Sequence, residues 1–311
     1  MLENLRTALD AAGIPARENE PLSAHCTFKI GGPADLFVQP KDSAQLCAAV
    51  ALCQAQQVPY YLLGNGSNIL FEDAGFRGAV LDLSAQQAGA RLLSSPEAEE
   101  ILISAPAGLK LSTLCNFAWK HSCTGLEFAY GIPGTVGGAV YMNAGAYGGE
   151  MKDVLKTVTY RTPEGEIVEA DAAALDLSYR HSIFEENGGC ILSATFCLKK
   201  GEPEAIQARM QELMGKRMEK QPLDKPSAGS TFKRPAGAFA AALIDQCGLR
   251  GYCHGGAAVS EKHCGFVVNL GGATCADVLA LCEEVRAIVK EKTGYDLEKE
   301  IRVVPASQKE E

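Results

Sequence analysis

Two glycine-rich segments carry residue types that can bind an anion through the backbone. The first follows the apolar run 58–63 and reads Gly64-Asn65-Gly66-Ser67-Asn68. Glycine lets the chain approach an anion so closely that several N–H groups can point at it, and the serine and asparagine side chains add further donors. This composition predicts recognition of a phosphate-like group. A plain Gly-Asn turn between two strands is the alternative.

The second segment, residues 131–149, interleaves glycine with isoleucine, valine and methionine and has almost no charge. A flexible linker would be rich in polar and charged residues. We therefore expect a chain that packs closely against a large, flat or extended ligand. Neither segment contains G-x-G-x-x-G or G-x-x-x-x-G-K-[ST], and a strand is expected after the first one. This argues against a Rossmann dinucleotide site and against a P-loop.

Composition and charge exclude several classes of protein. The 311 residues are 47% hydrophobic and carry a net charge of −9, which argues against disorder and against a nucleic-acid partner. No run of 18 apolar residues and no signal peptide is found, so we expect a cytoplasmic protein without a membrane partner. The twelve cysteines include no C-x-x-C pair, so no metal site is predicted and buried free thiols are expected.

The pattern of apolar residues and turn residues predicts an α+β protein. Predicted helices cover 1–17, a segment that begins at Asp42 or Ser43, 111–121, 205–220, 239–246 and 276–293. Predicted strands cover 28–30 and 34–38 around a Gly-Gly-Pro turn, 58–63, 69–71, 79–83, 101–105, a hairpin of 154–161 with 167–170, 190–198, 266–269 and 297–304.

Six motifs in order give the chain a resemblance that reaches from about residue 20 to residue 305. They are Thr27-Phe28-Lys29-Ile30-Gly31-Gly32, the two glycine-rich segments, Tyr179-Arg180-His181-Ser182-Ile183-Phe184, Ala228-Gly229-Ser230-Thr231-Phe232-Lys233 and Leu297-Glu298-Lys299-Glu300-Ile301-Arg302. Together they resemble the UDP-N-acetylenolpyruvoylglucosamine reductases, flavoenzymes of peptidoglycan precursor synthesis.

The resemblance implies an FAD-binding fold of the vanillyl-alcohol-oxidase (PCMH) type in two lobes, followed by a smaller α+β substrate domain. The expected divisions are an N-terminal helix and lead-in (1–24), the FAD-binding domain (25–200, with lobes of about 25–72 and 73–200) and the substrate domain (201–311). Non-covalent FAD and the co-substrate NADPH are implied. The implied reaction is reduction of the enolpyruvyl group of the nucleotide sugar to UDP-N-acetylmuramate.

By resemblance, three residues carry the chemistry. Arg180 stabilises the negative charge that hydride addition creates, Ser230 donates a proton to the α-carbon, and Glu300 assists that protonation. Each residue has a plainer alternative, namely a surface ion pair, a turn residue and an exposed charge, respectively.

The resemblance also assigns binding residues. Those for FAD are Gly64, Asn65, Gly66, Ser67, Asn68, Gly131, Ile132, Pro133, Gly134, Thr135, Gly137, Gly138, Ala139 and Gly145. Those for the substrate are Tyr179, Lys220, Lys233 and His263. Residues 216–234 include six basic and two acidic side chains, so their charge is opposite in sign to that of the whole chain and suits a diphosphate and a carboxylate. A solvated basic face, and a structural role for His263, are the alternatives.

Some residues depart from the family pattern. The short segment 184–189 has no tyrosine, which matches the lidless subtype (type II), and Arg234 stands where the lidded subtype has an amide. We have no account of Cys26. Two other functions compete with the reductase: an FAD oxidase on the same scaffold, in some cases with covalent flavin, and a non-catalytic nucleotide-sugar or flavin sensor.

Overall fold

The structure, a computed structural model, describes residues 1–94 and 99–307. The chain forms two compact units, and each unit is assembled from segments that are separate along the sequence. Unit 1 consists of Met1–Ala16, Val38–Asn65 and Val80–Arg217. Unit 2 consists of Arg17–Phe37, Gly66–Ala79 and Met218–Glu311. The division expected from the sequence, with boundaries after residues 24 and 200, stays a prediction.

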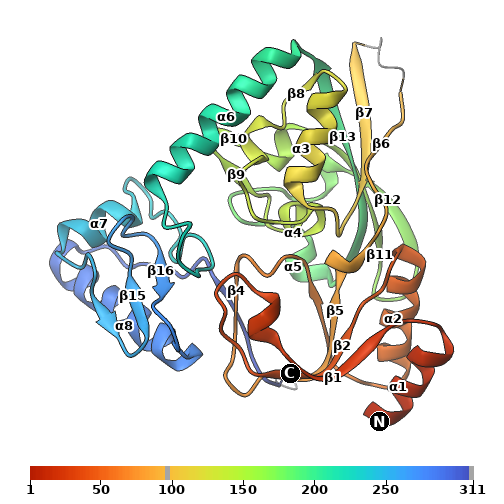
Figure 1. The fold of residues 1–311 in the computed structure, drawn as a ribbon, viewed down its shortest axis with the longest axis horizontal. Coiled ribbons are helices and arrows are strands. Elements are labelled where there is room, and N and C mark those ends of the chain that lie inside the picture. The colour runs from red at the N-terminus through yellow and green to blue at the C-terminus, as the bar shows by residue number, and fades with distance from the viewer. Residues whose placement is uncertain (95–98, 308–311) are drawn as a thin grey trace. The chain divides into compact units, whose positions relative to one another are not determined.

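Unit 1 is built on an antiparallel sheet of order β12-β11-β13-β7-β6, with β8 paired to the end of β13 (Figure 1). Alternate side chains of β13 are buried, and the pair Val158↔Ala194 lies almost fully buried at the centre. The strands are β6 Arg91–Leu92, β7 Glu100–Pro106, β8 Cys123–Thr124, β11 Leu155–Arg161, β12 Ile167–Asp171 and β13 Cys190–Lys200.

Helices of unit 1 pack against this sheet and against one another. The short helix α4 packs against β13 and β7, and α1 packs against α2. The helices are α1 Leu2–Ala11, α2 Ser43–Ala55, α3 Leu111–Lys120, α4 Val136–Tyr141, α5 Phe184–Asn187 and α6 Pro203–Lys220, whose last residues enter unit 2. A two-stranded ribbon, β9 Gly145–Ala146 with β10 Gly149–Glu150, follows α4.

Unit 2 contains a three-stranded antiparallel sheet of order β14-β15-β16, against which α8 packs (Figure 1). Thr274 and Asp277 form a capping box at the start of α8, and Gly294 ends it at φ +80°. Strand β17 pairs in parallel with β4. The elements are β4 Ile69–Phe71, α7 Ala240–Gln246, β14 Cys253–His254, β15 Ala257–Val259, β16 Val267–Asn269, α8 Cys275–Thr293 and β17 Arg302–Val304.

A further sheet has the strand order β1-β2-β5-β3. Its strands are β1 Ala16–Pro21, β2 Pro33–Val38, β3 Tyr60–Leu63 and β5 Phe76–Asp82.

Three sequence-based expectations about elements are wrong. The first helix ends at Ala11 instead of residue 17, because Gly13 takes φ +67° and Pro15 cannot continue a helix. Residues 28–30 form a turn instead of a strand, with Lys29 at φ +58°, although Phe28 and Ile30 are buried. The strand expected over 297–304 is confined to Arg302–Val304.

Several short elements, among them α4, β1 and β15, were not expected from the sequence. The second glycine-rich segment contains α4, which begins behind Thr135 as its N-cap. Glycine disfavours the interior of a helix, so the two adjacent glycines of this helix hide it in the sequence.

Nine of the twelve cysteines are buried, Cys47 and Cys197 are half-buried, and Cys253 is exposed; all are free thiols. Burial raises the pKa of Cys53 and Cys282 to about 12, which keeps these thiols protonated. Among the described residues, no helix is both long and apolar enough to cross a membrane.

Candidate functional site

The two glycine-rich segments meet within unit 1. The Asn65 Nδ2 donates to the Pro133 carbonyl at 2.7 Å, and a Cβ on Gly64 would lie 2.5 Å from the Thr135 Oγ1. Glycine is therefore required at position 64 by close approach of the second segment. Residues almost seventy positions apart are thus in contact, as the predicted FAD site needs.

The first turn of α4 is held by the protein itself. The Val136 and Gly137 N–H groups donate to the Leu109 and Ala107 carbonyls, both at 2.8 Å. The buried Thr135 side chain accepts the Gly138 N–H at 3.4 Å. A Cβ on Gly137 would lie 2.9 Å from the Ala107 Cβ, so this glycine permits close packing, and its N–H is already used.

Arg217 lies against the start of the second glycine-rich segment. Its guanidinium donates to the Gly131 carbonyl, and a Cβ on that glycine would lie 3.1 Å from the Arg217 Cδ. Burial lowers the pKa of Arg217, while a hydrogen bond with Tyr147 acts in the opposite direction. The Arg217 Nε is buried without a hydrogen-bond partner among the described residues. A buried, unsatisfied donor next to the predicted cofactor segment fits a ligand rich in acceptors, such as FAD.

The predicted catalytic Arg180 sits at the tip of a tight turn in unit 1. Ser178 and His181 exchange two backbone hydrogen bonds of 3.2 Å, which leaves Tyr179 and Arg180 as the two central residues. Arg180 has φ +58°, a conformation that side chains with a Cβ rarely adopt. Its guanidinium lies 5.1 Å from the centre of the exposed Tyr179 ring.

Side-chain hydrogen bonds connect both ends of this turn to the residues at the end of α4. The Asn143 Nδ2 donates to the Ser178 carbonyl at 3.0 Å, and the Ser182 Oγ donates to the Tyr141 carbonyl at 2.6 Å. The His181 ring contacts Glu185 at 2.8 Å and Asp176 at 3.3 Å. Asn143 and Ser182 lie inside the motifs but were not among the predicted site residues; a buried polar side chain cannot be told from an exposed one in a single sequence.

Ser230 and Glu300 are brought together within unit 2 by backbone pairing. The Glu300 N–H donates to the Thr231 carbonyl, and the Lys233 N–H donates to the Glu298 carbonyl, both at 2.8 Å. Ser230 is therefore the chain neighbour of Thr231, whose carbonyl accepts the Glu300 N–H. Glu300 is only 8% exposed, and Ser230 is half-buried behind Gly229 at φ +76°.

The Ser230 segment is fastened on its other sides as well. The Thr231 N–H donates to the Gly265 carbonyl, and the buried Thr231 Oγ1 accepts the Val267 N–H, both at 2.8 Å. From the first glycine-rich segment, the Asn68 Nδ2 donates to the Glu300 carbonyl at 3.3 Å. The end of the first glycine-rich segment thus lies beside the predicted proton-transfer residues, while its beginning, Gly64 and Asn65, belongs to unit 1.

The predicted substrate residues of unit 2 differ in their surroundings. Lys220 is exposed, whereas Lys233 forms an ion pair with Glu298, which offsets part of the positive charge of 216–234. Burial lowers the pKa of His263, and its Nδ1 accepts the Gly265 N–H at 3.2 Å, which favours the neutral ring. Among the predicted substrate residues, Tyr179 belongs to unit 1, as does its neighbour Arg180. Lys220, Lys233 and His263 belong to unit 2.

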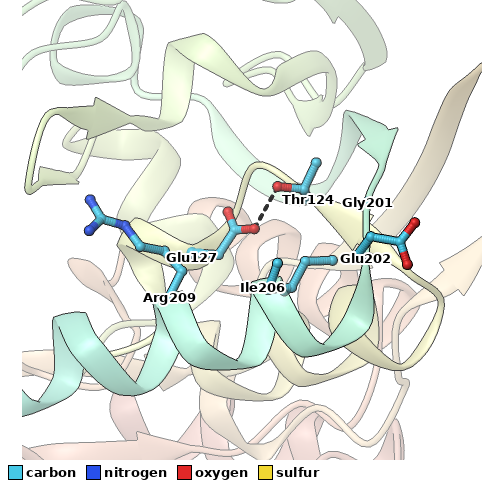
Figure 2. A pocket seen from close by; sticks show the side chains of 7 residues that line it. Thr124, Glu127, Gly201, Glu202, Ile206 and Arg209 are labelled. Carbon is cyan, nitrogen blue, oxygen red and sulfur yellow. Dashed lines mark hydrogen bonds between the residues drawn. The ribbon is translucent and has the colours of Figure 1, made fainter.

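A pocket elsewhere in unit 1 offers no comparable chemistry (Figure 2). It contains none of the predicted site residues, and the Glu127 carboxylate is occupied by the Thr124 Oγ at 2.6 Å and the Gly125 N–H at 2.8 Å. It is lined by Thr124, Glu127, Gly201, Glu202, Ala205, Ile206 and Arg209.

Comparison with known proteins defines first the class of the protein. Residues 34–171 match the model of the FAD-binding domain family, and this range includes all of the predicted cofactor residues. The chain has the PCMH-type FAD-binding fold and is an FAD-containing oxidoreductase, as the sequence predicted.

Closer relatives specify the family. Residues 221–304 match the C-terminal domain of UDP-N-acetylenolpyruvoylglucosamine reductase. The reductases of Lachnoclostridium phytofermentans and Clostridium novyi are 51% and 46% identical to the chain, over 92% and 97% of it and over 92% and 95% of their own lengths. The crystal structure of the Thermus caldophilus reductase is similar, with a TM-score of 0.76 and 33% identity over 94% of this chain and 99% of that one. The chain belongs to the UDP-N-acetylenolpyruvoylglucosamine reductase family.

Proposed function

We propose that the protein catalyses NADPH-dependent reduction of UDP-N-acetylglucosamine enolpyruvate to UDP-N-acetylmuramate, a step of peptidoglycan precursor synthesis. The observation that carries the proposal is the backbone pairing of the Ser230 segment with the Glu300 segment, inside a chain that is 51% identical to a reductase of this name. The pairing keeps a hydroxyl and a buried carboxyl on neighbouring segments, as proton transfer through Ser230 with help from Glu300 requires. The cytoplasmic location stays a prediction.

The residues of unit 1 fit FAD. Gly64 and Asn65 contact the second glycine-rich segment at Thr135 and Pro133, and next to that segment the buried Arg217 Nε has no hydrogen-bond partner among the described residues. The remaining proposed contacts are Gly66, Ser67, Asn68 and Gly145. FAD, when bound, supplies the hydride that it receives from NADPH.

The chain's own residues manage the charge and the proton. Hydride addition to the terminal methylene forms one C–H bond and places negative charge on the α-carbon and the carboxylate. Arg180 binds that carboxylate, because its guanidinium stays charged and can donate two parallel hydrogen bonds. Ser230 gives its hydroxyl proton to the α-carbon, which forms the second C–H bond, and Glu300 assists.

The substrate residues would bind the rest of the nucleotide sugar. Lys220 is free to reach a phosphate, whereas Lys233 must exchange its partner Glu298 for the diphosphate. Tyr179 presents an exposed ring beside Arg180, and the neutral His263 can donate from Nε2. These contacts are proposed from the family motifs.

Substitution of the proton donor tests the proposal. In Ser230→Ala, we expect NADPH to reduce the flavin at the normal rate, because no proton reaches substrate in that half-reaction. Reoxidation of the flavin by the enolpyruvyl sugar should slow by about 10²–10⁴-fold, the usual contribution of a general acid. Stopped-flow measurement of both half-reactions decides the matter, and unchanged reoxidation would exclude Ser230 as the donor.

Acid precipitation separates the competing oxidase. We expect the flavin to remain in the supernatant, since FAD is proposed to be non-covalent. Flavin that stays in the pellet would support an oxidase with a covalent cofactor, and a protein that binds flavin but shows no reoxidation with the sugar would support a sensor.

A further inference from the structure

Asn143, just after α4, connects the cofactor segment with the Tyr179–Arg180 turn. It is 1% exposed, and every polar group of its amide is used. The Nδ2 donates to the Glu150 carboxylate at 2.7 Å and to the Ser178 carbonyl at 3.0 Å, and the Oδ1 accepts the Lys152 N–H at 2.9 Å. Asn143 has φ +38°, a region that asparagine tolerates better than most residues.

Ser182 fastens the opposite end of the turn to the same helix. It is fully buried, and its hydroxyl donates to the carbonyl of Tyr141, the last residue of α4. Two buried side-chain hydrogen bonds therefore join positions 178 and 182 to the C-terminal end of α4, with Arg180 midway between them.

The turn needs this support because Arg180 is in a strained conformation. An L-residue with a Cβ in the left-handed region costs about 1–2 kcal/mol, and such strain persists only where the surroundings hold the backbone in place. Within the turn, Ser178 and His181 exchange two backbone hydrogen bonds, and the His181 ring contacts Glu185 and Asp176. The α4 contacts add two buried connections that tie both ends of the turn to the cofactor segment.

We propose that Asn143 and Ser182 are positioning residues for Arg180: they hold the catalytic turn in register with the segment that binds the cofactor. The inference rests on the role of Arg180 in the proposed function. Asn143 and Ser182 would then affect the reaction only by fixing the position of the Arg180 guanidinium.

A double-mutant cycle tests this coupling. Asn143→Gly keeps a residue that accepts φ +38° and removes the amide. The flavin-loaded protein is reduced with dithionite and mixed with the enolpyruvyl sugar, and reoxidation of the flavin is followed. We expect Asn143→Gly to slow reoxidation on the order of 10- to 100-fold, the effect of a misplacement of about 1 Å. In an Arg180→Ala background, the same substitution should change the rate by less than about twofold.

Two further variants keep the test decisive. Ser182→Ala should show the same dependence on Arg180 and serves if Asn143→Gly does not fold. Gln54→Ala is the matched control, because Gln54 also bridges segments of unit 1 through an amide, donating to the Pro163 carbonyl at 3.0 Å and accepting from Arg161 at 2.9 Å. Gln54 lies in α2 and contacts the β11–β12 hairpin, away from the Tyr179–Arg180 turn in sequence, so reoxidation should stay normal.

The outcomes distinguish failure of the positioning role of Asn143 and Ser182 from failure of the catalytic role of Arg180. An equal loss from Asn143→Gly in both backgrounds would mean a structural role only and would overturn the positioning inference. The same holds if Asn143→Gly and Ser182→Ala both leave reoxidation unchanged. Normal reoxidation in Arg180→Ala alone would instead overturn the proposed role of Arg180.

Discussion

The two segments that carry the proposed catalytic residues are held in different ways. The Arg180 turn of unit 1 depends on side chains: Asn143 and Ser182 fasten its ends. The Ser230 segment of unit 2 is held mainly by its backbone, which pairs with Glu298, Glu300 and Gly265, with one further bond from the Val267 N–H to the Thr231 Oγ1. A segment held by side chains can be released by one substitution without loss of the fold, whereas a segment held by backbone pairing resists most substitutions. The side-chain hydrogen bonds of the Arg180 turn and the backbone pairing of the Ser230 segment can therefore be removed by separate substitutions.

The largest effect on stability is expected from breaking the backbone pairing. Thr231→Pro removes the N–H that donates to Gly265 and forces the chain at Ser230 away from its present course. We expect the free energy of unfolding to fall by about 3 kcal/mol or more. Denaturant titration measures this, with Thr231→Ser as the control that keeps both the N–H and the hydroxyl. A stable Thr231→Pro variant would contradict the view that the backbone holds this segment.

A smaller effect is expected at the strained arginine. Arg180→Gly and Arg180→Ala both remove the guanidinium, but only alanine keeps a Cβ at φ +58°. We expect the glycine variant to be the more stable of the two by about 1 kcal/mol, although both lose reoxidation by the substrate. Denaturant titrations of the pair give the difference. Equal stabilities would show that the turn stores no strain.

The smallest effect concerns pH and His263. Burial, and to a lesser extent Arg250, lower the pKa of this ring below its ordinary value of 6.5. Below pH 6.5 the unfolded chain binds a proton that the folded protein resists, so stability is present above that pH and declines as the pH falls toward the lowered pKa. We expect His263→Gln to reduce this decline. Unfolding midpoints measured on both sides of pH 6.5 provide the test, and an unchanged slope would contradict it.

Elements with local signals were well predicted. Asp42 caps α2 by accepting the Gln45 N–H, in agreement with the predicted start at Asp42 or Ser43, and α8 ends at Thr293, as predicted, where Gly294 follows at φ +80°. The hairpin of β11 and β12 also agrees with prediction, since its turn residues lie next to the strands they connect. Two failures also concern short stretches of sequence. Two adjacent glycines concealed α4, and a strand was predicted over 28–30, before the Gly-Gly-Pro turn, where Lys29 has φ +58°.

The candidate site likewise has some features that short stretches of sequence reveal and others that depend on contacts between distant segments. The amino-acid sequence alone determined which residue types are present, in which order, and hence the family and its FAD-dependent chemistry. Only the tertiary structure decided that Glu300 pairs with Thr231, that Asn143 reaches Ser178, and that Thr135 lies so close to residue 64 that glycine is required there. A cap or a tight turn involves neighbours within a few positions, so its residues reveal it. A contact between distant segments depends on which surfaces the whole core buries together, and no short stretch of sequence contains that information.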